Sequence, residues 1–251
     1  MAFDIDMRTV KLTVAYDGTD FVGWQRQGKG VSVQGLIEEA LSAIEGAPVT
    51  LHGAGRTDAG VHAVGQVASA RLAAAIDDRL LGRALNAHLP KSIRVTDVAT
   101  VPDAFHARFS ALSKTYEYRI WNGRTVPPFV RQSTWHWIEP LDLDRMQRAS
   151  AAIPGEHDFT AFRSARSLNH TTVREITSAS WRRGEEATLI FEISGKGFLR
   201  YMVRSLVGTL VEIGRGHRPV EDIARLLAAP DRAAAGRTAP ARGLFLMKVE
   251  Y

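Results

Sequence analysis

Residues 53–68 read GAGRTDAGVHAVGQVA and form a glycine-rich segment around one carboxylate, Asp58. Arg56 lies two positions before this acid, and glycines stand at positions 53, 55, 60 and 65. Glycines let a backbone turn sharply and leave room beside it for a large planar ligand. A carboxylate on such a loop can approach a substrate atom, as a nucleophile must, and a nearby cation favours its ionised form. The same pattern also fits a plain turn in which Asp58 pairs with Arg56, and the spacing does not decide between them.

Strands and helices alternate on both sides of this segment. Ser32 as N-cap and Gly46 as stop delimit a helix with a regular apolar face, and Pro90 ends a second helix. Alternation of apolar and polar residues predicts the strands. In the first half the predicted strands lie at 10–16, 49–52, 64–71 and 93–98, and the helices at 32–46 and 78–88. In the second half the strands lie at 114–121, 173–181, 187–194 and 244–251, and the helices at 142–152, 198–216 and 219–228.

This order of elements predicts an α+β fold made of two α/β halves with mostly antiparallel sheets. We expect an N-terminal domain at 1–105 that carries the Asp58 loop, and a C-terminal domain at 106–251. A central cleft between the halves is the expected place for a catalytic site.

The charge is divided unevenly between these halves. The chain has a net charge of +5, residues 1–105 carry −2, residues 106–251 carry +7, and 26 of the 32 basic residues are arginine. Arginine binds phosphate through a planar fork, so a basic half indicates a nucleic-acid partner. An arginine-rich composition with no such partner explains the numbers equally well.

Composition limits the other classes of protein. The absence of cysteine excludes disulfides and thiolate metal sites, no apolar run reaches the length of a membrane span, and the acidic N-terminus is unlike a signal peptide. We therefore expect a cytoplasmic protein. A metal site of Asp58 and His62 with His52 or His106 lacks the close ligand spacing of strong sites. The segment SGKGF at 194–198 lacks two parts of the phosphate-loop motif.

Two further segments combine cations with apolar residues. The stretch FHARFSALSKTYEYRIWN at 105–122 contains Arg108, Phe109, Tyr116 and Tyr118, and aromatic rings among cations can stack unpaired bases. An aromatic face that is simply core fits this stretch as well. In the predicted helix at 198–216, Arg200 and Arg204 are four residues apart and share one face, where an arginine near the core needs a carboxylate such as Asp58.

Taken together, these segments resemble the tRNA pseudouridine synthase A family. The matching pieces follow in the same order along nearly the whole chain. They are YDGTDFVGWQRQ (16–27), GAGRTDAGVHAVGQVA, NAHLP (86–90), FHARFSALSKTYEYRI, WHWIEPLD (135–142), GEHDFTAF (155–162), FLRYMVRSLVGTLVEIGRG (198–216) and APARGLFLMKVEY (239–251).

The resemblance implies an isomerase that converts uridine to pseudouridine at positions 38, 39 and 40 in the anticodon stem–loop of tRNA. It also implies a homodimer with no metal and no organic cofactor. By position, Asp58 matches the catalytic aspartate, Tyr116 the active-site tyrosine, Arg56 the arginine associated with base flipping, and Arg204 the arginine that pairs with the aspartate.

The arginines at the RNA surface are less clearly marked. Arg108, Arg163 and Arg166 are expected to bind substrate, and Arg174, Arg215 and Arg218 are further candidates for phosphate contacts. The segment 163–176 is less regular than the rest of the resemblance. Whether Asp58 attacks C1′ or C6, or removes a sugar proton, is not decided by the sequence. A noncatalytic RNA-binding module and a metal-dependent hydrolase that uses Asp58 and His62 are the competing hypotheses.

Overall fold

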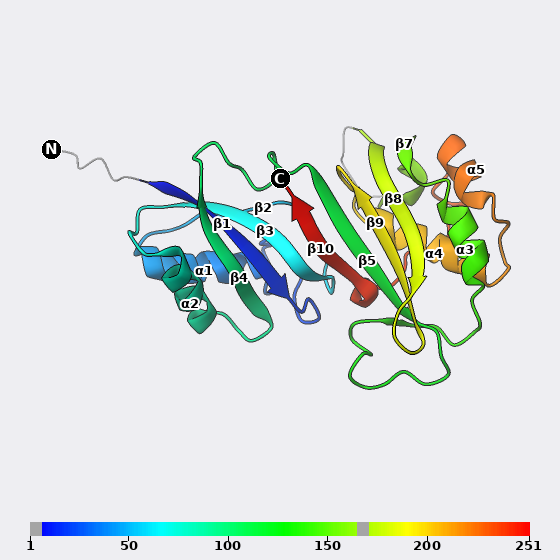
Figure 1. Ribbon diagram of the computed structural model, residues 1–251, viewed down its shortest axis with the longest axis horizontal. Coiled ribbons are helices and arrows are strands. Elements are labelled where there is room, and N and C mark those ends of the chain that lie inside the picture. The colour runs from blue at the N-terminus through cyan, green and yellow to red at the C-terminus, as the bar shows by residue number, and fades with distance from the viewer. Residues whose placement is uncertain (1–6, 165–170) are drawn as a thin grey trace. The chain divides into compact units, whose positions relative to one another are not determined.

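The computed structural model describes residues 7–164 and 171–251 (Figure 1). The chain forms two compact units. The first unit combines Met1–Leu112 with Leu246–Tyr251, and the second is Ser113–Phe245. Each unit contains a sheet and helices, which confirms the α+β class. Within the described ranges, no helix has the length and apolar character needed to cross a membrane.

The sheet of the first unit has the strand order β4-β1-β3-β10, and its β1–β3 and β1–β4 pairs are antiparallel. A short strand, β2, also pairs antiparallel with β3. On β1, Val10, Leu12 and Val14 are fully buried at alternate positions, as one face of a strand against a core requires. The bounds are β1 (Arg8–Tyr16), β2 (His52–Gly53), β3 (His62–Leu72), β4 (Ile93–Val101) and β10 (Leu244–Glu250).

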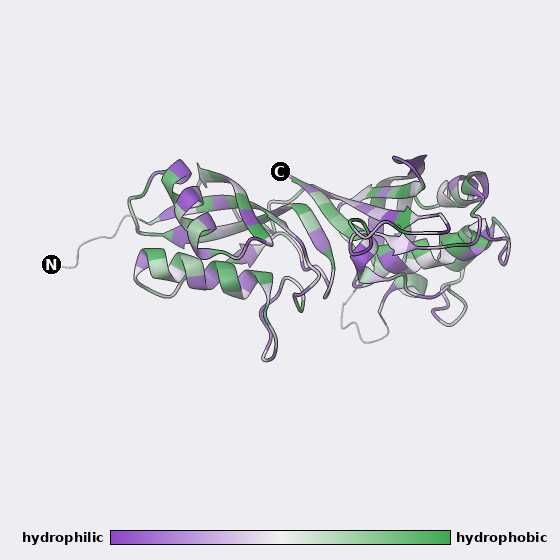
Figure 2. Cartoon of the chain, turned by 90° about the horizontal axis from the view of Figure 1, so that it is seen from below, coloured by the Kyte–Doolittle hydropathy of each residue, from purple (hydrophilic) through white to green (hydrophobic). Residues whose placement is uncertain are grey.

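Two helices complete the first unit, α1 (Val33–Glu45) and α2 (Asp78–His88). The Ser32 side chain accepts a hydrogen bond from the Gly35 backbone N–H, which caps α1 as predicted. Gly46 ends that helix in the left-handed conformation, with φ of 74°. Each helix carries both hydrophobic and hydrophilic residues (Figure 2), and Ile37 and Leu41 lie on the fully buried side of α1.

The second unit has the strand order β5-β9-β8-β7, with all three pairs antiparallel, and β6 pairs parallel with β5. Tyr116 pairs with Ile193 and Tyr118 with Phe191 across β5 and β9. Strands β6 and β7 were not among the expected elements. The bounds are β5 (Ser113–Trp121), β6 (Trp135–His136), β7 (Gly155–Asp158), β8 (Val173–Arg183) and β9 (Thr188–Gly195).

The helices of the second unit correct one prediction. The helix expected at 198–216 begins only at Met202, because Tyr201 adopts a left-handed backbone conformation with φ of 68°. Arg200 therefore precedes the helix, and the predicted helical face shared by Arg200 and Arg204 is wrong. The helices are α3 (Leu143–Ser150), α4 (Met202–Gly214) and α5 (Asp222–Ala228), with short 3-10 turns η1 (Thr160–Phe162) and η2 (Ala241–Gly243).

Candidate active-site residues and their supports

The Asp58 loop connects β2 to β3, and its backbone is held from several directions. The Trp24 N–H donates to the Thr57 carbonyl at 3.1 Å, and the Val61 N–H donates to the Asp58 carbonyl at 3.1 Å. Gly23 and Asp58 also form an isolated antiparallel bridge. The segment before α1 thus fixes the path of the backbone that carries Asp58, whose side chain is half-buried.

Side chains from strands β1 and β3 also form hydrogen bonds with the loop. The Tyr16 hydroxyl lies 2.8 Å from the Thr57 hydroxyl, and the fully buried Gln66 donates from Nε2 to the Gly55 carbonyl at 3.0 Å. Burial raises the pKa of Tyr16, so its phenol stays protonated and available for this hydrogen bond. These contacts tie the loop to strands β1 and β3 of the sheet.

Gly23 allows the close approach of the two segments. Its φ is +110°, and a Cβ at this position would lie 2.6 Å from the Thr57 carbonyl oxygen. A larger residue would strain the backbone and push the Asp58 loop away. Sequence reasoning assigned no role to Gly23 or Tyr16, although both lie in a segment that carries the family resemblance.

Arg56 and Asp58 remain on one loop but differ in exposure. Arg56 is exposed, whereas Asp58 is half-buried. The loop therefore presents a cation to solvent two residues from the carboxylate. This arrangement suits a residue that contacts RNA beside a reacting group.

His62, considered above as a metal ligand together with Asp58, has other partners in the structure. Among the described residues, no three His, Cys, Asp or Glu side chains come close enough together to hold a metal ion. His62 is buried, its Nδ1 accepts a hydrogen bond from the Gly18 N–H at 3.1 Å, and the same atom lies 3.2 Å from Asp17 Oδ1. Burial raises the pKa of Asp17, but hydrogen bonds from the Thr19 hydroxyl and backbone N–H outweigh it and keep that pKa below its ordinary value. His62 thus helps to hold the Asp17 turn.

In the second unit, Tyr116 and Tyr118 lie on the same side of β5, as their spacing predicted. Tyr116 is 7% exposed and its ring meets Phe198 edge to face at 5.0 Å between centroids. Tyr118 is fully buried and donates its hydroxyl proton to the Pro240 carbonyl at 2.7 Å. Burial raises the pKa of Tyr118. Tyr118 is therefore a core residue, and Tyr116 is the member of the pair beside a partly exposed aromatic neighbour.

Arg204 lies in the first turn of α4, and its side chain contacts a backbone carbonyl and an aromatic ring. Its Nε donates to the Ala239 carbonyl at 2.8 Å, and its Cζ lies 4.9 Å from the centroid of the Tyr201 ring. The Ala239 N–H in turn donates to the Arg204 carbonyl at 3.0 Å. Arg200 contacts the same Tyr201 ring at 4.9 Å. The left-handed Tyr201 thus places one aromatic ring within reach of both arginines.

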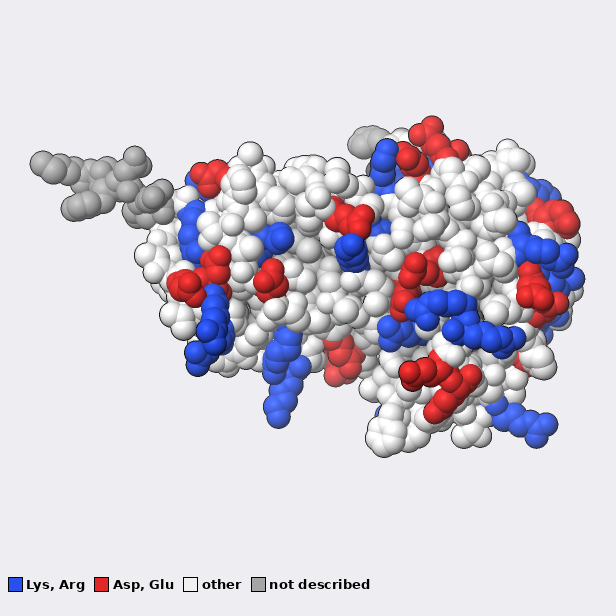
Figure 3. All heavy atoms as spheres, viewed as in Figure 1, with Lys and Arg blue, Asp and Glu red and all other residues white. Residues whose placement is uncertain are grey.

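Some of the candidate phosphate-binding arginines have side chains that reach solvent, and others are bound to groups of the same chain. Arg108 is exposed and Arg163 is partly exposed, whereas Arg166 lies outside the described residues. Arg174 is partly buried and donates to the Thr171 carbonyl at 3.2 Å, and burial lowers its pKa. On the face drawn in Figure 3, lysines and arginines are interspersed with acidic side chains.

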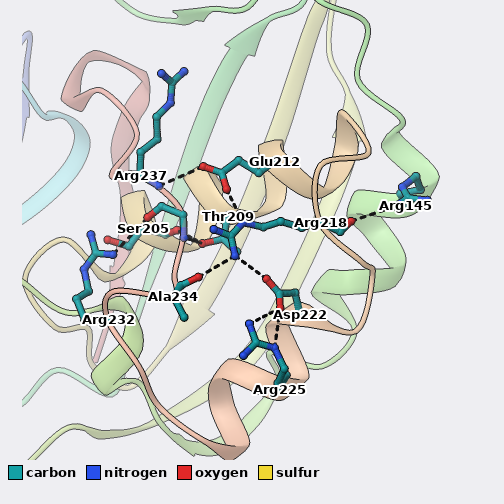
Figure 4. Close-up of polar contacts among 11 residues, drawn as sticks. Arg145, Ser205, Thr209, Glu212, Arg218, Asp222, Arg225, Arg232, Ala234 and Arg237 are labelled. Carbon is teal, nitrogen blue, oxygen red and sulfur yellow. Dashed lines mark hydrogen bonds and ion pairs between the residues drawn. The ribbon is translucent and has the colours of Figure 1, made fainter.

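Arg215 and Arg218 are held by carboxylates of the same unit. Arg215 lies 2.8 Å from Glu139. Arg218 forms ion pairs with Glu212 and with Asp222, and donates to the Ala234 carbonyl at 2.7 Å (Figure 4). These contacts give Arg218 a structural role and argue against a phosphate contact there.

The comparisons with known proteins identify the class to which this chain belongs. A family model described as tRNA pseudouridine synthase matches residues 12–110 and 149–251. The chain belongs to this family. It is therefore an isomerase whose substrate is tRNA.

Individual relatives match over nearly their full length. The tRNA pseudouridine synthase A of Geotalea uraniireducens (strain Rf4) is 44% identical over 245 residues, which are 98% of this chain and 100% of the relative. The enzyme of the same name from Syntrophotalea carbinolica is 46% identical over 98% of this chain and 97% of the relative. Among solved structures, a crystal structure of a Cbf5-Nop10-Gar1 complex matches 80% of this chain and 45% of its own chain, with a TM-score of 0.36 and 15% identity.

Proposed function

We propose that this enzyme converts uridine to pseudouridine at positions 38, 39 and 40 of the tRNA anticodon stem–loop, with Asp58 as the nucleophile. The observation that carries this proposal is the position of Asp58 on a loop whose backbone is braced by both Gly23 and the sheet. A braced loop holds a reactive group in place before the substrate arrives, which is what nucleophilic catalysis requires.

The reaction requires one bond to break and another to form on the same uracil. The N1–C1′ bond is cleaved, the base rotates, and C5 is joined to C1′. The proton lost from C5 is balanced by a proton gained at N1, so substrate and product are isomers. A carboxylate nucleophile divides this exchange into two easier steps through a covalent intermediate.

The target uridine must first leave the base stack, which costs a few kcal/mol. Arg56 is exposed at the loop, and we assign it to the space that the uridine vacates. Tyr116 is assigned to stack on the extruded uracil and to assist in the removal of the C5 proton. The neighbouring Phe198 ring supports the orientation of Tyr116.

Arg204 is assigned to support the negative charge of the nucleophile. The bond from its Nε to the Ala239 carbonyl fixes the plane of the guanidinium group, as a directed ion pair requires. Arg204→Lys keeps the charge but loses the planar fork. We expect Arg204→Ala to lower both kcat and thermal stability, and Arg204→Lys to recover the stability better than the rate.

The RNA surface is proposed to include Arg108 and Arg163, because both side chains reach solvent. Each phosphate contact that is removed should flatten the dependence of log Kd on log salt by about one unit. The enzyme is further proposed to act as a homodimer in the cytoplasm. Light scattering coupled to size exclusion would give the mass of the free enzyme and of its tRNA complex.

The specificity is tested by incubating the enzyme with an unmodified tRNA transcript and mapping pseudouridine along the whole RNA. We expect modification at positions 38–40 and nowhere else. A matched transcript with cytidine at these three positions should stay unmodified. Modification in another arm would reject the assigned position while leaving the chemistry in place.

A further inference from the structure

A ladder of aromatic rings lies on the surface of the first unit, on residues to which the proposed function gives no role. The His52 and His106 rings are 4.9 Å apart between centroids, and the His106 and Phe109 rings are 4.4 Å apart. The ring planes are tilted relative to each other by 32° in the first pair and by 35° in the second. The Arg108 Cζ lies 5.6 Å from the centroid of Phe109. The ladder joins strand β2 to the turn that precedes β5.

Phe109 is 78% exposed, although the turn that carries it is rigid. The His106 N–H donates to the Ser110 hydroxyl at 3.1 Å, and the Ser110 N–H donates to the His106 carbonyl at 2.9 Å. The N–H groups of Arg108 and Phe109 both donate to His106 Nδ1, at 3.1 and 3.3 Å. The backbone of the turn is thus braced around one imidazole ring.

The turn is also anchored to the rest of its unit. The Ala107 N–H donates to the hydroxyl of the buried Ser69 on β3 at 3.1 Å, and the Ala107 carbonyl accepts from the Tyr251 hydroxyl at 2.8 Å. The Phe105 and Tyr251 rings lie 4.8 Å apart. Here the anchored turn keeps the ring in solvent, where it contributes little to stability and is ready for a ligand.

The charge of the ladder suits RNA. His106 Nδ1 accepts two backbone hydrogen bonds, so the ring is neutral with its proton on Nε2. A neutral ring can stack within the ladder without repelling Arg108. The arginine beside Phe109 supplies the cation for a phosphate, and the ring supplies a face for a base.

We propose that His52, His106 and Phe109, with Arg108 beside them, form a stacking platform for an unpaired tRNA nucleobase other than the uridine that reacts. β2, which carries His52, leads directly into the Asp58 loop, so the platform shares a rigid element with the proposed nucleophile. The platform rests on the proposed tRNA substrate but does not require that Asp58 be the nucleophile. It holds the RNA during the reaction through a base that remains unmodified.

The test compares the RNA affinity of Phe109→Ala with that of two control variants. Stacking on one aromatic ring is worth roughly 1–3 kcal/mol, so Phe109→Ala should bind tRNA about 5- to 150-fold more weakly by fluorescence anisotropy. Phe109→Trp, which keeps an aromatic face, should bind within about threefold of wild type. Leu112 is also exposed, at 64%, so Leu112→Ala removes apolar surface without an aromatic ring and should leave the affinity unchanged.

A fully paired RNA duplex and a salt titration separate the possible causes. The duplex offers no free base, so Phe109→Ala should not weaken its binding. Phe109→Ala should also keep the wild-type salt dependence, whereas Arg108→Ala should reduce the slope by about one unit.

Four results would overturn the platform: an unchanged tRNA affinity for Phe109→Ala, an equal loss for Leu112→Ala, an equal loss with the duplex, or a changed oligomeric state with RNA affinity retained. The last result would make the ladder an interface between copies of the chain. Because affinity is measured without turnover, these results are independent of the pseudouridine map and of the Asp58 substitution.

Discussion

Asp58 and Asp222 both have an arginine within a few positions in the sequence, but the structure supports the two aspartates in different ways. Asp58 is half-buried on a loop whose backbone is fixed by hydrogen bonds from Trp24 and Val61. Asp222 is 3% exposed, and its carboxylate itself is bound by arginine side chains. The loop that carries Asp58 therefore has supports along its backbone, whereas the Asp222 carboxylate is itself the link between two arginines.

The arginine network around Asp222 shows the structural use of such a pair (Figure 4). Arg218 Nη1 lies 2.7 Å from Asp222 Oδ2, and Arg225 Nη2 lies 2.6 Å from Asp222 Oδ1. Burial raises the pKa of Asp222, but the two arginines outweigh it and keep that pKa below its ordinary value. Arg218 also bridges to Glu212 on α4, and Arg145 donates to the Arg218 carbonyl at 3.0 Å. The network thus ties α3, α4 and α5 together.

The largest expected effect comes from exchanging each aspartate for its amide. Asp58→Asn should lower the rate of pseudouridine formation by at least about a thousandfold, because the nucleophile is lost. Its tRNA affinity should stay within a few-fold of wild type, and its melting temperature should fall less than that of Asp222→Asn, because the backbone of the Asp58 loop has hydrogen bonds of its own. Asp222→Asn should show the opposite pattern, with a lower melting temperature and a normal rate for the folded protein.

Tritium release from tRNA labelled at uracil C5 and thermal unfolding measure the two properties separately. If Asp58→Asn lost affinity and rate in equal measure, its role would be binding rather than chemistry. If Asp222→Asn lost its rate while melting normally, the division between the two carboxylates would be wrong.

The next largest effect should follow from removing the centre of the structural network. Arg218→Ala removes the Arg218 partner of Glu212 and leaves Asp222 with Arg225 alone, and we expect a loss of about 2–4 kcal/mol in the free energy of unfolding. Arg225→Ala is the matched control, because Arg225 has a side chain that is 56% exposed and contacts Asp222 alone among these acids. It should cost about 1 kcal/mol or less. Urea unfolding of both variants gives the comparison, and equal losses would remove the special role of Arg218.

A smaller effect is expected from a substitution at Gly23, whose backbone pairs with that of Asp58. Gly23→Ala places a Cβ 2.6 Å from the Thr57 carbonyl oxygen at a φ of +110°. The strain should cost about 1–3 kcal/mol, and movement of the loop should lower kcat by about tenfold or more. At Gly28, a Cβ would meet no atom within 4 Å, so Gly28→Ala is the control. A normal kcat for Gly23→Ala would show that the loop is not positioned through this contact.

The contrast between the two aspartates also shows what the sequence could reveal. Helix α1 and its caps, Ser32 and Gly46, followed from local patterns, because capping depends on neighbours in the chain. The start of α4 did not follow, because the left-handed Tyr201 interrupts a run of residues that are apolar for tertiary reasons. The ion pairs of Arg218 with Glu212 and Asp222 also could not be predicted from the sequence. Composition counts arginines but does not show which ones have a carboxylate within reach.

For Asp58 itself, the motif supplied the residue and the structure supplied its support. The resemblance picked out Asp58, Arg56, Tyr116 and Arg204 by position, and their roles stay predictions. The hydrogen bonds from Gln66 and Tyr16 to the loop join residues far apart in the chain, and no spacing rule indicates them. Likewise, nothing in the sequence shows that β10, the last strand, takes its place beside β3.

The smallest effect is expected at His106. Among the described residues, its ring is held by hydrogen bonds from two backbone N–H groups to Nδ1, and not by an ion pair. Burial, followed by the charges of His52 and Arg108, lowers the pKa of His106 below 6.5. The folded state therefore binds fewer protons than the unfolded state, and the contribution of His106 to stability is complete above about pH 6.5 and is lost as the pH falls below it. An NMR titration should find this depressed pKa in wild type. In Arg108→Ala it should move back toward the ordinary value, because one cation is gone, whereas Leu112→Ala should leave it in place. A His106 pKa above 6.5 in wild type would mean that Nδ1 does not accept the two backbone hydrogen bonds, and that the turn carrying Phe109 is not braced in solution.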